Sequence, residues 1–307
     1  MTAAQLLAFI TVALLLQLAA GVAWALWQRG SVPGAPAPEA NSDADADSDV
    51  QPASPGSQGA WPGWRDFRVV RRVFEDAAQS QCSFYLQPVD GAPLTPFQPG
   101  QYLTFSLKLP ADRTLTRCYS LSDRPDPTGY RITIKRALPP PGQPTLPPGL
   151  SSNHFHDRVH EGDVIQVRAP AGQFFIDRDP SVPAVLVAGG IGITPMMSML
   201  RWCLAEQPDR LVHLYYGVRN RADHAFKQVL EDLAARHPTL SLNVVHSSPG
   251  ADDLLARDYQ HVGHVDVALL RRTLPHGRQQ VYVCGPPAMM QSLVPALRDW
   301  GVQPGDL

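Results

Sequence analysis

The clearest pattern in the chain is an apolar run at residues 184–188, followed by the turn sequence Gly-Gly-Ile-Gly-Ile-Thr-Pro. An uninterrupted run of this length is typical of a strand buried on both faces. We expect the turn to lead into a helix, with Thr194 as N-cap and Pro195 at the first helical position. Glycines let a ligand approach the backbone, and a helix N-terminus offers N–H groups to a pyrophosphate. A tight strand-to-helix connection without a ligand would show the same pattern.

Between residues 66 and about 177 the apolar positions alternate with period two. The clearest alternating segments are 102–107, 130–135 and 164–168, with Gly or Pro turns between them. Several short strands at this spacing favour an antiparallel β-barrel. The proline-rich run 139–148 is expected to be a loop, because proline serves neither a central strand nor a helix. After it, we expect one short helix capped by Ser or Asn and containing residues 154–159.

Beyond residue 182, strands and helices alternate. We expect strands at 211–216, 240–245 and 280–284, and helices at 223–235 and 287–300. This alternation predicts a parallel sheet with helices on both faces, which binds ligands at the carboxyl ends of its strands. The segments 189–194, 217–221 and 284–287 all follow strands, so the pattern brings them to one crevice.

The N-terminal region has a different character. Residues 6–27 carry no charge, are long enough to span a bilayer, and end near Trp24, Trp27 and Arg29. We expect a single transmembrane helix at residues 5–28, in the inner (cytoplasmic) membrane. Arg29 favours a cytoplasmic location for the residues after the span. A cleaved signal peptide is the alternative, which the absence of Lys or Arg before the run disfavours.

Composition divides the remaining chain. Residues 29–62 consist largely of Pro, Ala, Ser, Gly and Asp, so we expect a disordered linker. We place a barrel at 63–179 and an α/β domain at 180–307. A net charge of -2 gives no reason to expect a nucleic-acid partner. The four cysteines have no Cys-x-x-Cys spacing, which argues against a metal site and favours free thiols. We interpret His154 and His156 as surface or capping residues.

Five short motifs follow one another in a recognisable order. They are Phe-Gln-Pro-Gly-Gln-Tyr at 97–102, Arg-Cys-Tyr-Ser at 117–120, Gly-Leu-Ser-Ser-Asn at 149–153, the glycine turn at 189–195 and Cys-Gly-Pro at 284–286. This order resembles the ferredoxin–NADP reductase superfamily, especially the reductase modules of flavohaemoglobins and iron–sulfur oxygenase reductases. The resemblance covers about residues 66–300. It implies an antiparallel β-barrel FAD domain followed by an α/β parallel-sheet NAD(P)-binding domain.

The resemblance also implies roles in FAD binding. Arg117 would neutralise the pyrophosphate, a task suited to a guanidinium group. Tyr119 would stack on the isoalloxazine, and Ser120 would hydrogen-bond near flavin N5. The remaining FAD-binding residues would be Ile134, Lys135, Gly149, Ser151 and Ser152, the two serines donating N–H and hydroxyl groups to the pyrophosphate. Taken singly, Arg117 and Lys135 would rather be interpreted as solvated strand charges and Tyr119 as a core aromatic; the ordered set of motifs favours the binding roles instead.

In the second domain the resemblance implies a nicotinamide dinucleotide site. Its residues would be Gly190, Gly192, Thr194, Gly285 and Pro286, with Cys284 close to nicotinamide C4 as a catalytic residue beside Ser120. A buried cysteine is also commonly a small core hydrophobe. Arg219 and Arg221 follow a strand with no acidic residue beside them, which favours a 2′-phosphate and therefore NADPH over NADH.

The sequence thus predicts a membrane-tethered FAD-dependent NAD(P)H oxidoreductase that passes single electrons to an iron–sulfur or haem acceptor. That acceptor would be a separate protein or a fused iron–sulfur domain absent from this chain. A non-catalytic nucleotide-binding subunit of a membrane redox complex and a ferric or flavin reductase are the alternatives. The family usually adds one more strand after its last helix, whereas only residues 301–307 follow here. Two readings fit: a fragment of a longer reductase whose sheet lacks that strand, or a shortened form whose flavin face is uncovered. Residues 306–307 resemble the entry to the missing strand, which favours the fragment.

Overall fold

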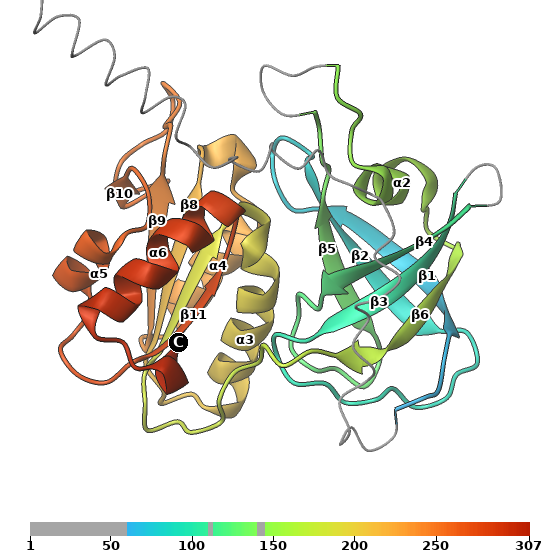
Figure 1. The fold of residues 1–307 in the computed structure, drawn as a ribbon, viewed down its shortest axis with the longest axis horizontal. Coiled ribbons are helices and arrows are strands. Elements are labelled where there is room, and N and C mark those ends of the chain that lie inside the picture. Colours follow the sequence, from blue (N-terminus) through green and yellow to red (C-terminus); the bar gives the residue numbers. More distant parts are fainter. Residues whose placement is uncertain (1–59, 110–112, 140–144) are drawn as a thin grey trace, which may run out of the picture. The chain divides into compact units, whose positions relative to one another are not determined.

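The barrel is built from six antiparallel strands, seen in the computed structural model, which describes residues 60–109, 113–139 and 145–307 (Figure 1). Their order in the sheet is β4-β3-β6-β1-β2-β5. Leu121 forms an isolated bridge to Ile132, which brings the two edges of the sheet together just beyond β4. The strands are β1 Arg65–Phe74, β2 Gln81–Pro88, β3 Tyr102–Leu109, β4 Arg113–Ser120, β5 Tyr130–Lys135 and β6 Val164–Ala171. The predicted antiparallel barrel is confirmed.

Alternate residues of these strands fill the barrel. Phe84, Leu103 and Phe105 are fully buried, as the period-two pattern predicts. Helix α2 (Leu150–Arg158) covers one end of the barrel and inserts Phe155 into the core, with ring centroids 5.3 Å from Phe84 and 5.5 Å from Phe105. This packing holds α2 against the strands.

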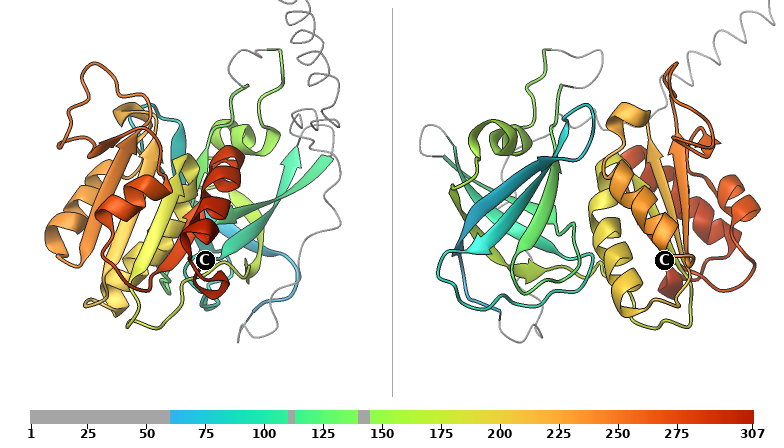
Figure 2. Two further views of the ribbon diagram at one scale, coloured as in Figure 1. Left: turned by 60° about the vertical axis from the view of Figure 1, so that its left-hand side comes forward. Right: turned by 180° about the vertical axis from the view of Figure 1, so that it is seen from behind.

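The second domain is a five-stranded parallel sheet with the order β10-β9-β8-β7-β11. Helices α3 and α4 pack on one face of this sheet through one hydrophobic cluster. Helices α5 and α6 pack on the opposite face through another (Figure 2). The strands are β7 Ala184–Gly189, β8 Val212–Val218, β9 Leu240–His246, β10 His261–Val262 and β11 Gln280–Cys284. The α-helices are α3 Ile193–Glu206, α4 Lys227–Arg236, α5 Val267–Thr273 and α6 Pro287–Trp300. The short 3₁₀ turns are η1 Gly190–Gly192, η2 Arg221–Asp223 and η3 Pro304–Asp306.

The nucleotide-domain pattern is confirmed at β7, where all six residues are buried. The predicted start of the helix after β7 is not confirmed. Gly192 is the N-cap of α3, because the 3₁₀ turn η1 continues directly into the helix. Thr194 therefore lies inside the first turn, where its hydroxyl donates to the Ile191 carbonyl oxygen over 3.1 Å. The predicted cap at Thr194 is wrong.

Three further local predictions are corrected. The helix predicted at 223–235 begins at Lys227, because Phe226 has a left-handed backbone with φ of 59°. Helix α2 begins after Gly149 with no side-chain cap, so the Ser or Asn cap is wrong. His156 is buried rather than a surface residue, and its Nε2 hydrogen-bonds the Ile134 carbonyl oxygen over 2.9 Å.

The C-terminal residues form the 3₁₀ turn η3 rather than the start of a strand, and Asp306 pairs with Arg278 over 2.7 Å. Strand β11 is an edge strand of the described sheet. The predicted transmembrane helix and most of the predicted linker lie outside the described residues. Within the described ranges, no helix is both long and apolar enough to cross a membrane.

Candidate functional site

The strand β4 carries the motif Arg-Cys-Tyr-Ser, and Tyr119 is its best-anchored member. The Tyr119 ring lies 5.3 Å from the ring of Phe155 and 5.8 Å from that of Phe105. Its hydroxyl oxygen is 2.7 Å from the Ser151 hydroxyl, at the start of α2. The side chain is partly buried, so one part packs on the core and the rest remains accessible. The core interpretation therefore holds for the packed side of the ring, and stacking on the isoalloxazine stays a prediction.

The N-terminus of α2 is hydrogen-bonded to Ala137, two residues after the end of β5. The Ser152 hydroxyl accepts the Ala137 N–H over 3.1 Å, and the Asn153 side chain donates to the Ala137 carbonyl oxygen over 2.8 Å. Gly149 is required here, because a Cβ would lie 2.7 Å from that of Ala137. Both predicted serine hydroxyls thus have protein partners. The first N–H groups of α2 remain suited to an anion, because a helix gives them no internal partner.

Arg117 and Ser120, the other two site residues predicted on β4, lie on opposite faces of the strand. Arg117 shares a face with Tyr119, is partly exposed, and donates to the Thr116 carbonyl oxygen over 2.8 Å. Ser120 pairs across the strands with Tyr102 of β3. The ring of Tyr102 packs against Gly172, where a Cβ would lie 2.8 Å from the ring. Tyr102 is a candidate flavin contact that we did not assign; only the strand register brings it beside Ser120.

Residues Ile134 and Lys135 end β5 and differ in burial. Ile134 is 1% exposed and belongs to the barrel core, with its carbonyl oxygen bonded to His156. Its side chain therefore packs inside the barrel, and its role in FAD binding stays a prediction. Lys135 is partly exposed and pairs with Gln81 across the strands.

The glycine turn after β7 packs directly on the end of β11. A Cβ at Gly192 would lie 2.5 Å from the Cys284 carbonyl carbon, and one at Gly189 would lie 2.5 Å from the Met289 sulfur. A Cβ at Gly285 would lie 3.2 Å from the Cα of Gly189. Gly190 differs, because it has φ of 53° and nothing lies within 4 Å of its Cβ position. The turn is thus closed towards β11 and open at Gly190, which suits a dinucleotide approaching the N-terminus of α3.

Cys284 ends β11 opposite Ala188 and is partly exposed. Burial raises the pKa of its thiol, so the thiol is protonated at neutral pH. A protonated thiol is a poor nucleophile and suits contact with a nicotinamide better than covalent catalysis. The neighbouring Pro286 is the N-cap of α6, so its position is fixed by that helix.

Arg219 and Arg221, in the loop after β8, are both held by aspartates. Arg219 donates to Asp223 over 2.6 Å, and the Arg221 backbone N–H donates to Asp253 over 3.1 Å. Our prediction of no acidic residue here is therefore wrong: Asp223 lies in the same loop, and folding adds Asp253 from a distant segment. The Arg219 side chain is 68% exposed, so it remains accessible to a phosphate. The choice between NADPH and NADH stays a prediction.

Two buried histidines lie near the ends of β8 and β9, close to this loop. His246 Nδ1 is 3.1 Å from Asp253, the carboxylate that also accepts the Arg221 N–H. His224 follows η2 directly, and its ring lies 6.4 Å from that of His246. Sequence reasoning assigned neither histidine a role; in the structure His246 contacts the carboxylate that holds the loop, and His224 lies beside it.

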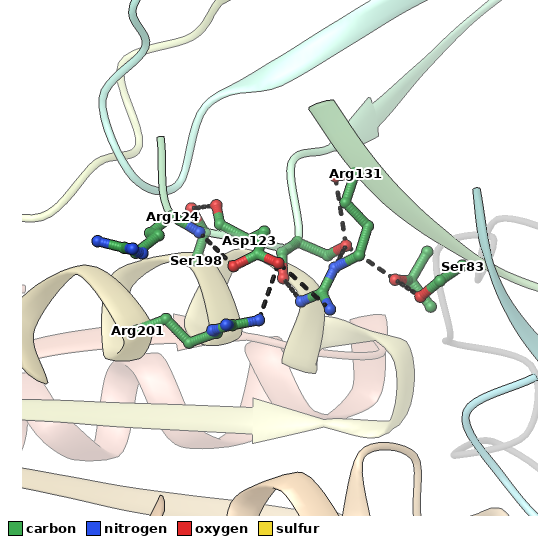
Figure 3. Close-up of polar contacts among 8 residues, drawn as sticks. Ser83, Asp123, Arg124, Arg131, Ser198 and Arg201 are labelled. Carbon is green, nitrogen blue, oxygen red and sulfur yellow. Dashed lines mark hydrogen bonds and ion pairs between the residues drawn. The ribbon is translucent and has the colours of Figure 1, made fainter. Parts of the chain in front are cut away.

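The residues that follow the Arg-Cys-Tyr-Ser motif of β4 are hydrogen-bonded to α3, the helix that follows the glycine turn. Asp123, three residues after Ser120, binds Arg201 and Ser198 of α3 (Figure 3). The two candidate sites are therefore linked by directly bonded segments.

Comparisons with known proteins agree with this geometry. Residues 84–176 match the family model described as oxidoreductase FAD-binding domain, and residues 186–294 match the oxidoreductase NAD-binding domain. A flavohemoprotein of Bacillus cereus is 37% identical over 247 residues, which are 80% of this chain and 60% of that protein. The chain thus spans about three fifths of the length of such curated relatives.

Solved structures show the same likeness. The flavohem-like FAD/NAD-binding domain of nitric oxide dioxygenase from Vibrio cholerae O1 biovar El Tor has a TM-score of 0.68 at 34% identity, covering 79% of this chain and 95% of that chain. Phthalate dioxygenase reductase, described as transferring electrons from pyridine nucleotides to [2Fe-2S], has a TM-score of 0.56 at 28% identity, covering 77% and 64%.

The two matched regions and the two folded domains define an FAD- and NAD(P)-binding oxidoreductase. The chain belongs to the family of these two-domain flavin reductases, and its module is of the flavohaemoprotein reductase type. The predicted cofactors, FAD and NAD(P)H, and the predicted enzyme class are confirmed at this level.

Proposed function

We propose that this chain is a membrane-tethered flavin reductase that takes hydride from NAD(P)H and delivers single electrons to an iron–sulfur or haem acceptor. The observation that carries the hydride-transfer part of the proposal is the direct bonding of Asp123, on the segment after the flavin motif, to α3, which begins at the glycine turn. Hydride transfer needs donor and acceptor held in close and fixed proximity, and linked segments provide that. Bound FAD would supply the conversion from two-electron to one-electron chemistry.

The residues fit both cofactors by their chemistry. For FAD, the chain offers Arg117, the aromatic ring of Tyr119 and the N–H groups at the start of α2. For the dinucleotide, it offers the open turn at Gly190 and the N-terminus of α3. Cys284 and Ser120 would orient the reacting groups. These assignments extend the family resemblance to individual residues of this chain.

The acceptor is proposed from the chemistry of relatives. Phthalate dioxygenase reductase delivers its electrons to [2Fe-2S], and the curated relatives are flavohemoproteins. An acceptor of either kind accepts one electron at a time. We propose that it is a partner protein or a separate domain, because the matched family regions cover FAD and NAD binding.

The membrane part of the proposal rests on the sequence. Residues 6–27 are uncharged and of spanning length, and Arg29 follows them. We propose a single inner-membrane span with the catalytic domains in the cytoplasm. Removal of residues 6–27 is expected to move the protein from carbonate-washed membranes to the soluble fraction. Recovery of the intact chain in the soluble fraction would contradict the tether without touching the enzyme activity.

The enzyme proposal is tested with the full chain purified in detergent. It should bind FAD close to one per chain, and its flavin absorbance should bleach anaerobically with NADPH or NADH. Subsequent addition of ferricyanide or cytochrome c should restore the oxidised spectrum. Running both nucleotides decides the predicted preference for NADPH. A chain that binds FAD and both nucleotides but never bleaches would support the non-catalytic subunit instead.

A further inference from the structure

Asp123 binds both domains through one carboxylate oxygen. Arg201 of α3 donates to Asp123 Oδ2 over 2.8 Å, and Arg131 of β5 lies 3.4 Å from the same oxygen (Figure 3). The carbonyl oxygen of Asp123 also accepts the Ser198 hydroxyl over 2.6 Å. These are three polar contacts, two of them with the same helix.

The contacts on α3 are made by the helix that begins at the glycine turn. Thr194, Ser198 and Arg201 are spaced by four and three residues, so they share one side of the helix. Ser198 is fully buried, and its hydroxyl has its partner on the other domain. A movement of α3 along or around its axis would break these contacts and would carry the N-terminal turn with it.

The segment that carries Asp123 also makes several contacts within the barrel. Leu121 bridges to Ile132, and the Ser122 hydroxyl lies 2.8 Å from that of Thr133. Arg131 also donates to the Ser122 hydroxyl over 3.2 Å and to the Ser122 carbonyl oxygen. The segment from Ser120 to Asp123 is thus fixed to β5 on one side and to α3 on the other.

Burial makes the charge of Asp123 important. The Arg131 side chain is 6% exposed and lies 5.2 Å over the ring of Phe226, while the Asp123 side chain is 23% exposed. Solvent screens such a group weakly, so loss of its counter-charge is costly. Arg201 is more exposed and reaches the same oxygen from the other domain.

We propose that Asp123 is a positioning residue for hydride transfer: its contacts with Ser198 and Arg201 set where α3, and therefore the nicotinamide, lies relative to Ser120 and the flavin. The inference rests on the proposed reductase function and deepens it. Asp123 acts through α3 and takes no part in the reacting bonds. Its influence follows from geometry, because a displacement of about 1 Å can slow a reaction on the order of 100-fold.

The test measures anaerobic flavin reduction in the full-length protein by stopped flow, at saturating nucleotide. Asp123→Asn keeps the shape of the side chain and removes its charge; Arg201→Ala removes the contact from the other side. We expect the reduction rate constant to fall about tenfold or more in each, with FAD content and nucleotide Kd within about twofold of wild type. The double variant should be little slower than the slower single variant, since both break one interaction.

Two matched variants serve as controls. Asp126→Asn makes the same chemical change in the same loop, where Asp126 accepts hydrogen bonds from the N–H and hydroxyl of Thr128. Arg124→Ala removes an exposed cation that lies 4.0 Å from Glu206 of α3. Both should reduce flavin at the wild-type rate. Arg201→Lys should recover part of the rate lost in Arg201→Ala, because it keeps the charge.

A second readout is independent of turnover. In the FAD-free protein, backbone amides of Ile193–Glu206 should exchange hydrogen faster in Asp123→Asn and Arg201→Ala than in the two controls. Arg201 is one-third exposed, so its variant keeps the test available if Asp123→Asn does not fold.

The outcomes separate the inference from the proposed function. Wild-type reduction rates in both variants overturn the positioning role and leave the reductase function standing. A slower rate accompanied by matching loss of FAD or nucleotide affinity also overturns it, since the residue would then be structural. A wild-type protein that is not reduced by either nucleotide overturns the proposed function, and the inference falls with it.

Discussion

Gly190 and Gly192 are two residues apart, yet the structure gives them opposite surroundings. A Cβ at Gly192 would press on backbone atoms of Cys284, which cannot move without shifting β11. Gly190 has open space at the same position and a left-handed backbone. One glycine is therefore required for packing within the domain, and the other leaves room for a ligand.

Substitution of these glycines is expected to separate stability from nucleotide binding. Gly192→Ala should lower the free energy of unfolding by about 1–3 kcal/mol, as overpacking does in a tight core. Gly190→Ala should cost about 1–2 kcal/mol for its backbone conformation and, in addition, weaken NAD(P)H binding, because the methyl group enters the open side of the turn. Urea unfolding and nucleotide titration measure the two effects. Unchanged nucleotide affinity in Gly190→Ala would argue against a dinucleotide at this turn.

The ends of β8 and β9 bring together a cluster of buried aromatic and histidine residues. His224 lies 5.2 Å from Tyr216 and 6.4 Å from His246, measured between ring centroids. Neither ring nitrogen of His224 has a hydrogen-bond partner among the described residues. Burial, with a smaller repulsion from Lys227, lowers the pKa of His224 to about 3.

The buried His224 should make the free energy of unfolding depend on pH. The unfolded chain binds a proton at His224 near pH 6.5, whereas the folded chain binds it only near pH 3, so stability falls as pH decreases between these values. His224→Phe should remove about 2 kcal/mol of the stability difference between pH 7 and pH 5, at about 1.4 kcal/mol per pH unit. Urea unfolding at both pH values measures it, with His276→Gln, at an exposed site, as control. Equal pH dependence in wild type and His224→Phe would contradict the assignment.

At the scale of elements, the sequence predicted the features that depend on local pattern. Alternation predicted β3 and β5, and the apolar run predicted β7, because burial of one or both faces dictates those patterns. The start of α4 was missed because Phe226 takes its left-handed backbone where its N–H bonds the Glu75 carbonyl oxygen of the barrel domain, over 2.9 Å. No local signal reports a partner 151 positions away.

In the candidate site, too, contiguous motifs could be predicted from the sequence, whereas residues brought together by folding could not. The motifs around Tyr119 and the glycine turn were visible because they are short and contiguous. Tyr102 beside Ser120, and Asp253 beside Arg221, depend on strand register and on a loop from another part of the chain. Asp123 was missed for the same reason, since its partners Arg131 and Arg201 lie in different domains.

At the scale of the whole molecule, the two domains share further hydrogen bonds besides the Asp123 contacts. The Ala78 N–H, in the turn between β1 and β2, donates to the Ala222 carbonyl oxygen over 3.0 Å. The side chain of Gln81, which is fully buried, donates to the Asp223 carbonyl oxygen over 3.0 Å. Separating the domains would break these bonds and expose the Phe226 ring, which packs under Arg131 and is 2% exposed. We therefore expect both domains to unfold together.

Two cysteines make this cooperativity measurable, because each is buried in a different domain. Cys82 lies in the barrel core and Cys203 in the α/β core, while Cys118 is exposed. FAD at about 100 times its Kd should slow thiol labelling of Cys82 about 100-fold under conditions where labelling requires unfolding. If the domains unfold as one unit, labelling of Cys203 should slow by the same factor, although FAD binds the other domain. Cys118 should label rapidly throughout.

Gln81→Leu tests the cause of that coupling. It keeps a buried side chain of similar size and removes the hydrogen bond to Asp223, so protection of Cys203 by FAD should decrease while protection of Cys82 persists. Mass spectrometry of the labelled peptides reads both cysteines in the same sample. Protection of Cys82 alone in the wild-type protein would mean that the domains open independently. The shared hydrogen bonds would then align the domains without joining their stability.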